Sequence, residues 1–321
     1  MEPLLQENPD RYVVFPIIHH DLWNLYKQHQ STYWTREEID FSHDLYDWNT
    51  KLNDSERFFL KHILAFFAAS DGLVSENLVS SFCQEVQYPE ARVFYGFQNM
   101  IENIHNETYS VMIDTYIQNS QERMDLFCAL ETFPAVQKKA FWAKKWMKCE
   151  KSEFSFSQRL VAFAIIEGIF FSASFCAIFW LARRNLMPGL CKSNEFIARD
   201  EGLHQLFACV LYKNHIVSKL TQTQVHDMFR EAVEVEYEFI THALPCRLLN
   251  MNAEHMYQYI QYVADRLLEQ LGYSALYRVQ NPFDFMKRND LMGKTNFFEC
   301  RVSEYQKVGI AETDFSTDSS F

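Results

Sequence analysis

The sequence contains little glycine and proline, the residues that most often interrupt regular structure. Its 321 residues include 8 Gly and 8 Pro, a much smaller share than the roughly 12% that the two residues usually make up in globular proteins. Such a chain has few positions for tight turns, which argues against a β-sandwich or a β-barrel with many short strands. We therefore expect long helices and an all-α fold.

Secretion signals and an excess of positive charge are also missing. The eight cysteines form no Cys-x-x-Cys pair, and the first residues include acidic groups but no long apolar stretch. Both absences predict a reducing, cytoplasmic location. The net charge of −12 at pH 7 argues against nucleic acid as a partner. The hydrophobic content of 48%, with 29 Phe and 16 Tyr, is sufficient for a large core.

One long apolar run, residues 160–182, is long enough to cross a bilayer. Glu167 lies in the middle of this run, where an ionisable group would be costly in lipid. The alternatives are a membrane helix and the central helix of a large helical bundle. We favour the bundle and expect no membrane partner.

Helix start and stop signals recur along the chain up to about residue 280. Glu56 can close a capping box with Asn53, and Thr221 with Gln224 forms a second box. The other signals are Pro134 at a first turn, Ser193 and Asn252 as N-caps, and Gly272 as a stop. We predict a single helical domain over residues 1–280, followed by a C-terminal segment over residues 281–321 that ends in a flexible tail.

Two Glu-x-x-His pairs, Glu102/His105 and Glu201/His204, lie in apolar helical stretches. Each follows another predicted helix that carries one embedded acid. These acids are Asp71 and Glu167. Positions i and i+3 share a helix face, so each pair can direct both side chains to one point. Each pair alone is weak evidence, but the twofold order of acid, then acid-x-x-His, is more specific.

Four carboxylates and two imidazoles from four helices match the di-iron or di-manganese site of a ferritin-like bundle, which is a known example of this pattern. An oxygen-rich ligand set with two imidazoles suits iron or manganese better than structural zinc. The alternative is a set of unrelated buried acids, each with a local hydrogen bond. We predict a di-metal site in the core of a ferritin-like helical bundle with additional helices.

A tyrosine and several apolar residues are placed to surround such a site. Tyr109 lies within about 60° of Glu102 and His105 around a helix with ~100° per residue, and could be either a redox-active phenol or an ordinary core residue. Phe171 and Phe175 follow the acid at 167 by four and eight residues. Ile197 precedes the acid at 201 by four. They can wall off the site, although each alone is more typical of core packing.

At these residues the sequence resembles the small, radical-generating subunit of class I ribonucleotide reductase, of the eukaryotic and DNA-virus type. The matching segments are YWTREEID, FFAASDGLVSENL, FYGFQNMIENIHNETYSVMIDTYI, VAFAIIEGIFFSASFCAIFWLARRNLMPGL, SNEFIARDEGLHQLFACVLY, NPFDFM and KTNFFECRVSEYQKVG. They span about residues 10–310, and their combination is highly specific.

The resemblance implies a role for each matching residue. Asp71, Glu102 and His105 would hold one iron, and Glu167, Glu201 and His204 the other, so that the chain carries two Fe, with Mn less expected. Tyr109 would be the radical tyrosine inside an apolar pocket of Phe171, Phe175 and Ile197. The radical-transfer route would include Trp34, Asp200, His105 and Tyr305. Phe315 and Phe321 would dock the C-terminal tail into the large catalytic subunit.

The expected function is therefore that of the small subunit of ribonucleoside-diphosphate reductase. By resemblance the chain forms a homodimer, uses O2 to form a tyrosyl radical, and lends the radical to the large subunit, which reduces ribonucleotides. One alternative is a di-iron oxidase or desaturase that acts directly on a small or lipid substrate. The other is an iron-storage or purely structural helical protein.

Overall fold

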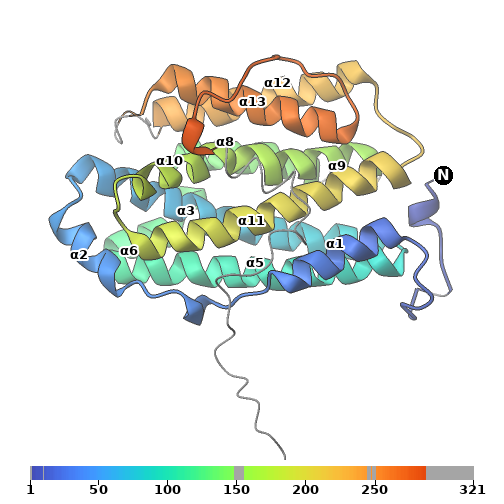
Figure 1. Ribbon diagram of the computed structural model, residues 1–321, viewed down its shortest axis with the longest axis horizontal. Coiled ribbons are helices and arrows are strands. Elements are labelled where there is room, and N and C mark those ends of the chain that lie inside the picture. The colour runs from blue at the N-terminus through green and yellow to red at the C-terminus, as the bar shows by residue number, and fades with distance from the viewer. Residues whose placement is uncertain (1, 10, 148–154, 244–246, 248–250, 287–321) are drawn as a thin grey trace, which may run out of the picture. The chain divides into compact units, whose positions relative to one another are not determined.

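All the regular secondary structure in the described part of the chain is helical, as the scarcity of chain-breaking residues predicts. The computed structural model describes residues 2–9, 11–147, 155–243, 247 and 251–286 (Figure 1). The described helices belong to one compact unit. The division at residue 280 and the docking role of residues 281–321 stay predictions.

The long helices carry the residues of interest. They are α1 (His20–Ser31), α3 (Asp54–Asn77), α5 (Pro89–Tyr116), α8 (Pro134–Met147), α9 (Phe156–Ile165), α10 (Ser172–Ala182), α11 (Pro188–Val210), α12 (Gln222–Glu238) and α13 (Ala253–Leu271). The shorter helices are α2 (Ser42–Thr50), α4 (Cys83–Glu85), α6 (Ser120–Phe127) and α7 (Ala129–Thr132). Within the described residues, four π-helical segments follow or interrupt long helices: η3 (Leu78–Phe82), η4 (Ile166–Phe170), η5 (Leu211–His215) and η6 (Phe239–Ala243).

Most of the predicted caps are present. The side chains of Asn53 and Glu56 form the capping box at the start of α3, and Thr221 with Gln224 forms the box at the start of α12. The side chain of Asn252 accepts hydrogen bonds from the first turn of α13. Gly272 ends that helix in the left-handed region, at φ 93°, where a side chain would be strained.

The predicted cap at Ser193 is wrong. Helix α11 begins five residues earlier, at Pro188, and the hydroxyl of Ser193 donates to the carbonyl oxygen of Leu190 inside the helix. The first turn is capped from α2 instead, because the carboxylate of Asp44 accepts from the backbone N–H groups of Gly189 (2.8 Å) and Leu190 (2.7 Å). A cap supplied by a residue far away in the sequence leaves no local pattern to read.

The apolar run of residues 160–182 is helical but not one uniform helix. It forms α9, the π-helical segment η4 and α10, with Glu167 in the π-helical segment. Two helical stretches, Asp54–Glu85 and Phe156–Ala182, are long and apolar enough to cross a membrane. The most apolar window of Phe156–Ala182 is wholly buried in the protein, as expected for the central helix of a bundle.

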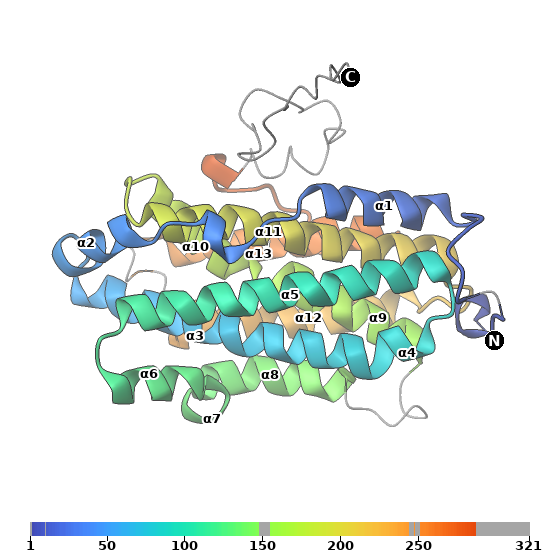
Figure 2. The same cartoon turned by 90° about the horizontal axis from the view of Figure 1, so that it is seen from below.

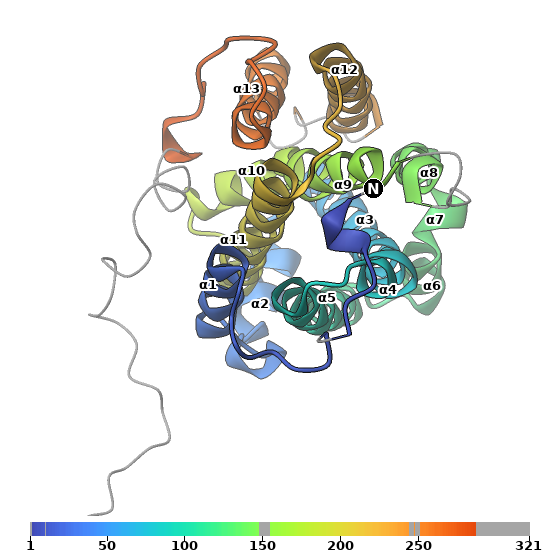
Figure 3. The ribbon, with the colours of Figure 1, turned by 90° about the vertical axis from the view of Figure 1, so that its right-hand side faces the viewer.

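The helices that matter for function pack around this central element. Helix α3 lies along α5, and α1 packs against both α5 and α11 (Figure 2). Helix α11 also contacts α9 and α10. Viewed along the helix axes, α12 and α13 lie side by side beyond α9 and α10 (Figure 3). The faces of α3, α5, η4 and α11 are therefore directed toward a shared interior.

Candidate metal centre

The six predicted metal ligands converge in this interior. They are Asp71 on α3, Glu102 and His105 on α5, Glu167 on η4, and Glu201 and His204 on α11. None of them is more than 3% exposed. Their ligand atoms form two groups, within each of which all the atoms lie within 4.8 Å of one another: Asp71, Glu102 and His105, and Glu102, Glu167, Glu201 and His204. Glu102 belongs to both groups, so it can bridge two cations.

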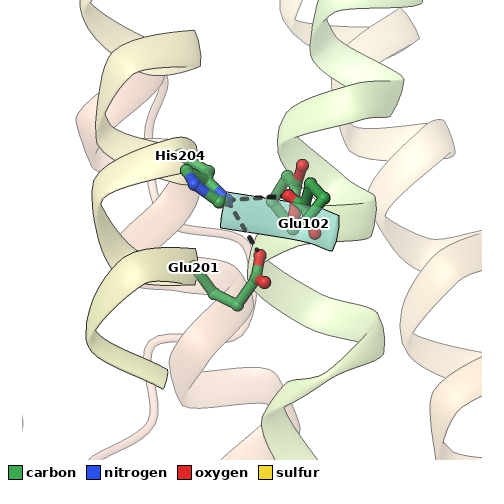
Figure 4. Close-up of side chains that lie close together, drawn as sticks. Glu102, Glu201 and His204 are labelled. Carbon is green, nitrogen blue, oxygen red and sulfur yellow. Dashed lines mark hydrogen bonds and ion pairs between the residues drawn. The ribbon is translucent and has the colours of Figure 1, made fainter. Parts of the chain in front are cut away.

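The i, i+3 spacing places each histidine beside the carboxylate of its own helix and opposite that of the other. The Nδ1 atom of His204 lies 3.0 Å from a carboxylate oxygen of Glu102 and 3.3 Å from one of Glu201 (Figure 4). The Nδ1 atom of His105 lies 3.1 Å from Glu201 and 3.5 Å from Glu102. Both imidazoles therefore direct Nδ1 to the same carboxylates.

The polar atoms of the cluster fit bound cations. Several buried atoms make no hydrogen bond: Asp71 Oδ2, Glu102 Oε1, His105 Nδ1, Glu167 Oε2 and Glu201 Oε1. Buried polar atoms are nearly always paired, and four carboxylates face only two imidazoles here. Two divalent cations would both balance the negative charge and bond the unpaired atoms. Oxygen ligands with two imidazoles suit iron or manganese.

The carboxylates show the cost of gathering like charges in a buried place. Burial, reinforced by the neighbouring carboxylate of Glu102, raises the pKa of Asp71 well above its usual value. Burial and the charge of Glu201 raise the pKa of Glu167 in the same way. Burial would also raise the pKa of Glu201, but the imidazoles of His204 and His105 outweigh it and hold that pKa well below its usual range.

The two imidazoles respond in the opposite sense. Burial alone would lower the pKa of His105, but the carboxylates of Asp200, Glu102 and Glu201, which lie 3.1–3.5 Å from its ring nitrogens, raise it well above its usual value. For His204, the charges of Glu201 and Glu102 outweigh burial and raise the pKa to about 9. In the protein chain alone, protons thus supply positive charge that cations would otherwise bring.

The predicted transfer residues Trp34, Asp200 and His105 form one connected group. The indole Nε1–H of Trp34 donates to Asp200 Oδ2 over 2.7 Å, and the same oxygen lies 3.3 Å from His105 Nε2. The rings of Trp34 and His105 are stacked, with centroids 6.0 Å apart. A carboxylate on the far nitrogen of a ligating histidine orients the ring and increases its basicity.

Tyr109 lies buried beside the cluster. Burial, together with the charges of Asp71 and Glu201, raises the pKa of its phenol well above the usual value. Its ring stacks on Phe67, with centroids 4.8 Å apart, and Phe67 stacks in turn on Phe175 at 5.2 Å.

The three predicted pocket residues are all buried. Phe171 and Phe175 stack on each other and on Phe67. They therefore reach Tyr109 through Phe67, a residue that sequence reasoning missed. Its position four residues before Asp71 places it on the ligand face of α3 and could have indicated this role. Ile197 is buried on α11, one turn before Glu201, and its contact with Tyr109 stays a prediction.

Two further polar residues were missed. The side-chain amide of Gln98 donates to Glu167 Oε1 over 3.0 Å. It precedes Glu102 by four residues, so helical spacing could have found it. The guanidinium of Arg199 donates to Asp200 Oδ1 and to the carbonyl oxygen of Thr32, which ties the end of α1 to α11.

Three predicted site residues, Tyr305, Phe315 and Phe321, lie outside the described residues. Their roles stay predictions.

Comparisons with known proteins agree with this geometry. The family model described as "Ribonucleotide reductase, small chain" matches residues 11–282. A ribonucleoside-diphosphate reductase small chain of Neurospora crassa is 57% identical over 318 residues, which cover 99% of this chain and 77% of that protein. The small chain of Variola virus is 55% identical, with 100% of both chains covered.

The fold is also shared with a solved relative. The structure of the Rnr4 homodimer of Saccharomyces cerevisiae matches with a TM-score of 0.82 and 36% identity, over 91% of this chain and 93% of that one. The all-α, ferritin-like prediction is confirmed. With a buried di-metal ligand set on this fold and a family match over most of its length, the chain belongs to the ribonucleotide reductase small chain family.

Proposed function

We propose that this chain is the radical-generating small subunit of a ribonucleoside-diphosphate reductase that holds two iron ions, with manganese as the less favoured metal. The observation that carries the proposal is the convergence of six ligating side chains beside a buried tyrosine. Asp71, Glu102 and His105 would hold one iron. Glu167, Glu201 and His204 would hold the other.

The oxidised residue is Tyr109. When bound, two iron ions would supply the electrons that reduce O2, and the oxidising power gained from O2 would act on the phenol of Tyr109. Tyr109 gives up one electron and its phenolic proton and becomes a radical. Phe67, stacked on the phenol ring, and Phe171 and Phe175 beyond it surround the radical with apolar side chains. They exclude water and reductants, so that the radical persists.

The radical leaves the site through the hydrogen-bonded group of Trp34, Asp200 and His105. One oxygen of Asp200 accepts from the indole N–H and faces the far nitrogen of the imidazole. The aspartate thus holds the proton of each donor in place while an electron moves between the aromatic rings. Tyr305 would continue the route in the C-terminal segment.

The partner of the exported radical is the large catalytic subunit, which would bind Phe315 and Phe321 of the tail in two apolar pockets. The chain would form a homodimer, like that of Rnr4 in the solved structure. We expect it to act in the cytoplasm. Neither nucleic acid nor a membrane is a proposed partner.

A direct oxidase or desaturase is the alternative that shares the ligand set. The family match favours radical export over direct oxidation, because the small-chain family model covers residues 11–282 and the Neurospora crassa small chain is 57% identical over 99% of this chain.

The radical is tested by electron paramagnetic resonance after loading with ferrous iron and O2. The wild-type chain is expected to give a stable tyrosyl signal and to bind about two irons. Tyr109→Phe should lose the signal and keep the irons, because a phenyl ring fills the same space. A signal that persists in Tyr109→Phe would contradict the assignment, and many irons per chain would indicate storage.

The enzyme function is tested by ribonucleotide reduction with and without an added large subunit. Activity is expected only in the mixture. It should be lost on removal of the residues after Gly309, although the radical signal remains. Turnover of a small or lipid substrate by the chain alone would favour the oxidase alternative.

A further inference from the structure

The described structure leaves three imidazole nitrogens without hydrogen bonds in one buried place. His29 lies on α1, which packs against α5 and α11, and is completely buried. Neither of its ring nitrogens makes a hydrogen bond, and Nε2 of His204 makes none either. The centroids of the two rings are 4.8 Å apart and their planes are inclined by 68°. An ordinary core histidine has at least one partner, so this pair needs an explanation.

The direction of the His204 ring determines which atom needs a partner. Its Nδ1 atom is directed to the carboxylates of Glu102 and Glu201, which are the proposed metal ligands. A neutral imidazole that binds a cation through one nitrogen carries its proton on the other. With a cation on Nδ1, the proton of His204 would therefore lie on Nε2, and a buried N–H group requires an acceptor.

The groups known to lie around the two rings are apolar rings or carboxylates that already have partners. On the α5 side, His29 contacts the phenyl rings of Phe94 and Phe97, whose centroids lie 5.3 and 4.8 Å away. The charged groups on the other elements that act on His29 are Asp200, Glu201 and the imidazole of His105. The oxygens of Asp200 already face Trp34, His105 and Arg199, and Glu201 lies on the Nδ1 side of His204.

We propose that His29 is the positioning residue of His204: a ring nitrogen of His29 accepts a hydrogen bond from His204 Nε2–H, directly or through one water molecule. The terminal torsion of a histidine is broad, so either ring can turn toward the other. The bond would fix His204 with Nδ1 toward the cation. This inference rests on the proposed function, because it uses the six-ligand assignment.

The two histidine ligands then have different partners. His105 has a carboxylate, Asp200, on its far nitrogen, whereas His204 has a neutral ring. A carboxylate increases the basicity of a ligating imidazole more than a neutral acceptor does. The cation on the His204 side is therefore expected to bind more weakly than the one on the His105 side.

The test is an anaerobic titration of the metal-free, full-length chain with Mn²⁺, in which electron paramagnetic resonance measures the free ion and gives two dissociation constants. His29→Phe retains an aromatic ring against Phe94 and Phe97 but has no acceptor. It is expected to weaken the looser site by about tenfold to 100-fold and to leave the tighter site within about twofold. His29→Gln, which returns an acceptor at a similar reach, should recover most of the loss.

Asp200→Asn is the matched control, because it weakens the partner of the other histidine. It should weaken the tighter site, so that the ratio of the two constants falls, whereas His29→Phe should increase that ratio. Thermal melting of the metal-free variants shows whether the fold is intact. If His29→Phe melts at a lower temperature than wild type, two other variants replace it. His29→Gln has an acceptor, and His29→Met has a similar length but no strong acceptor, so their dissociation constants give the same comparison.

Three results would overturn the inference. They are two constants unchanged in His29→Phe, two constants weakened equally, and no recovery in His29→Gln. Failure of the wild-type chain to bind two cations is a different outcome, because it would overturn the proposed function itself.

Discussion

Two buried clusters of charged residues in this protein differ in whether the chain itself balances their charge. In the first, four carboxylates face two imidazoles at the metal centre, and the chain supplies too little positive charge to balance them. In the second, the ammonium group of Lys139 on α8 is paired with the carboxylate of Glu236 on α12. Both clusters are buried, but only the second is balanced within the chain.

The ammonium group of this pair has further partners besides Glu236. The ammonium of Lys139 donates to the carbonyl oxygen of Phe170 over 2.7 Å and lies 3.8 and 3.7 Å from the ring centroids of Phe66 and Phe239. Burial still lowers the pKa of Lys139 to about 8 and raises that of Glu236 to about 7. The comparison teaches that burial alone does not mark a functional site, whereas unbalanced buried charge indicates a missing partner.

The largest effect is expected from a substitution that disrupts the unbalanced cluster. Glu102→Gln removes the carboxylate that belongs to both ligand groups and keeps the side-chain volume. Affinity for both cations should fall by more than about 100-fold, because loss of a ligand exceeds the loss expected for an outer partner. The metal-free variant should melt at the same temperature as wild type or higher, because one buried negative charge is gone. Metal analysis and calorimetry measure the two effects, and retention of two tightly bound cations would contradict the bridging role.

The next largest effect is expected from a substitution that disrupts the balanced pair of Lys139 and Glu236. Lys139→Met leaves Glu236 buried without its partner, and we expect a loss of about 3–5 kcal/mol in the free energy of unfolding. The double variant Lys139→Met/Glu236→Leu should regain most of that stability, because both charges are removed. Denaturant unfolding of the metal-free forms gives the values. A double variant as unstable as the single one would show that the pair has a role beyond mutual compensation.

The smallest expected effect is a pH dependence of stability that comes from His204 in the unbalanced cluster. The pKa of His204 is raised to about 9 from the ordinary histidine value of 6.5, so the folded metal-free chain holds this proton more tightly than the unfolded chain. The resulting stability is complete below pH 6.5 and is lost as the pH rises through 9, by about 3 kcal/mol at 1.36 kcal/mol per pKa unit. The difference in unfolding free energy between wild type and His204→Gln should shrink over this range. A difference that stays constant with pH would contradict the raised pKa.

Regular patterns within one helix made much of the site predictable. The i, i+3 pairs on α5 and α11 and the lone acids Asp71 and Glu167 predicted the cluster that the structure brings together. The same local logic predicted the capping boxes at Asn53 and Thr221. Each of these patterns depends only on the geometry of a single helix, which the sequence contains in full.

Features that depend on packing between helices could not be predicted in this way. The cap of α11 comes from Asp44 on α2, so the prediction at Ser193 was wrong. Phe67 lies between Tyr109 and the two predicted phenylalanines only because α3 packs on α5. His29 gave no sequence signal, since a single histidine acquires its meaning only when α1 places it beside His204.

The cap of α11 by Asp44 also bears on biosynthesis. A ribosome releases the chain from its N-terminus, so α2 has left the exit tunnel well before the first turn of α11, which lies 145 residues from Asp44. Asp44, which caps that turn, has therefore already been synthesised when the last two ligands, Glu201 and His204, are added to the chain. Because these two residues follow the other four in the chain, the complete ligand set cannot exist earlier, and loading of the second cation must be a late event in the maturation of the nascent protein.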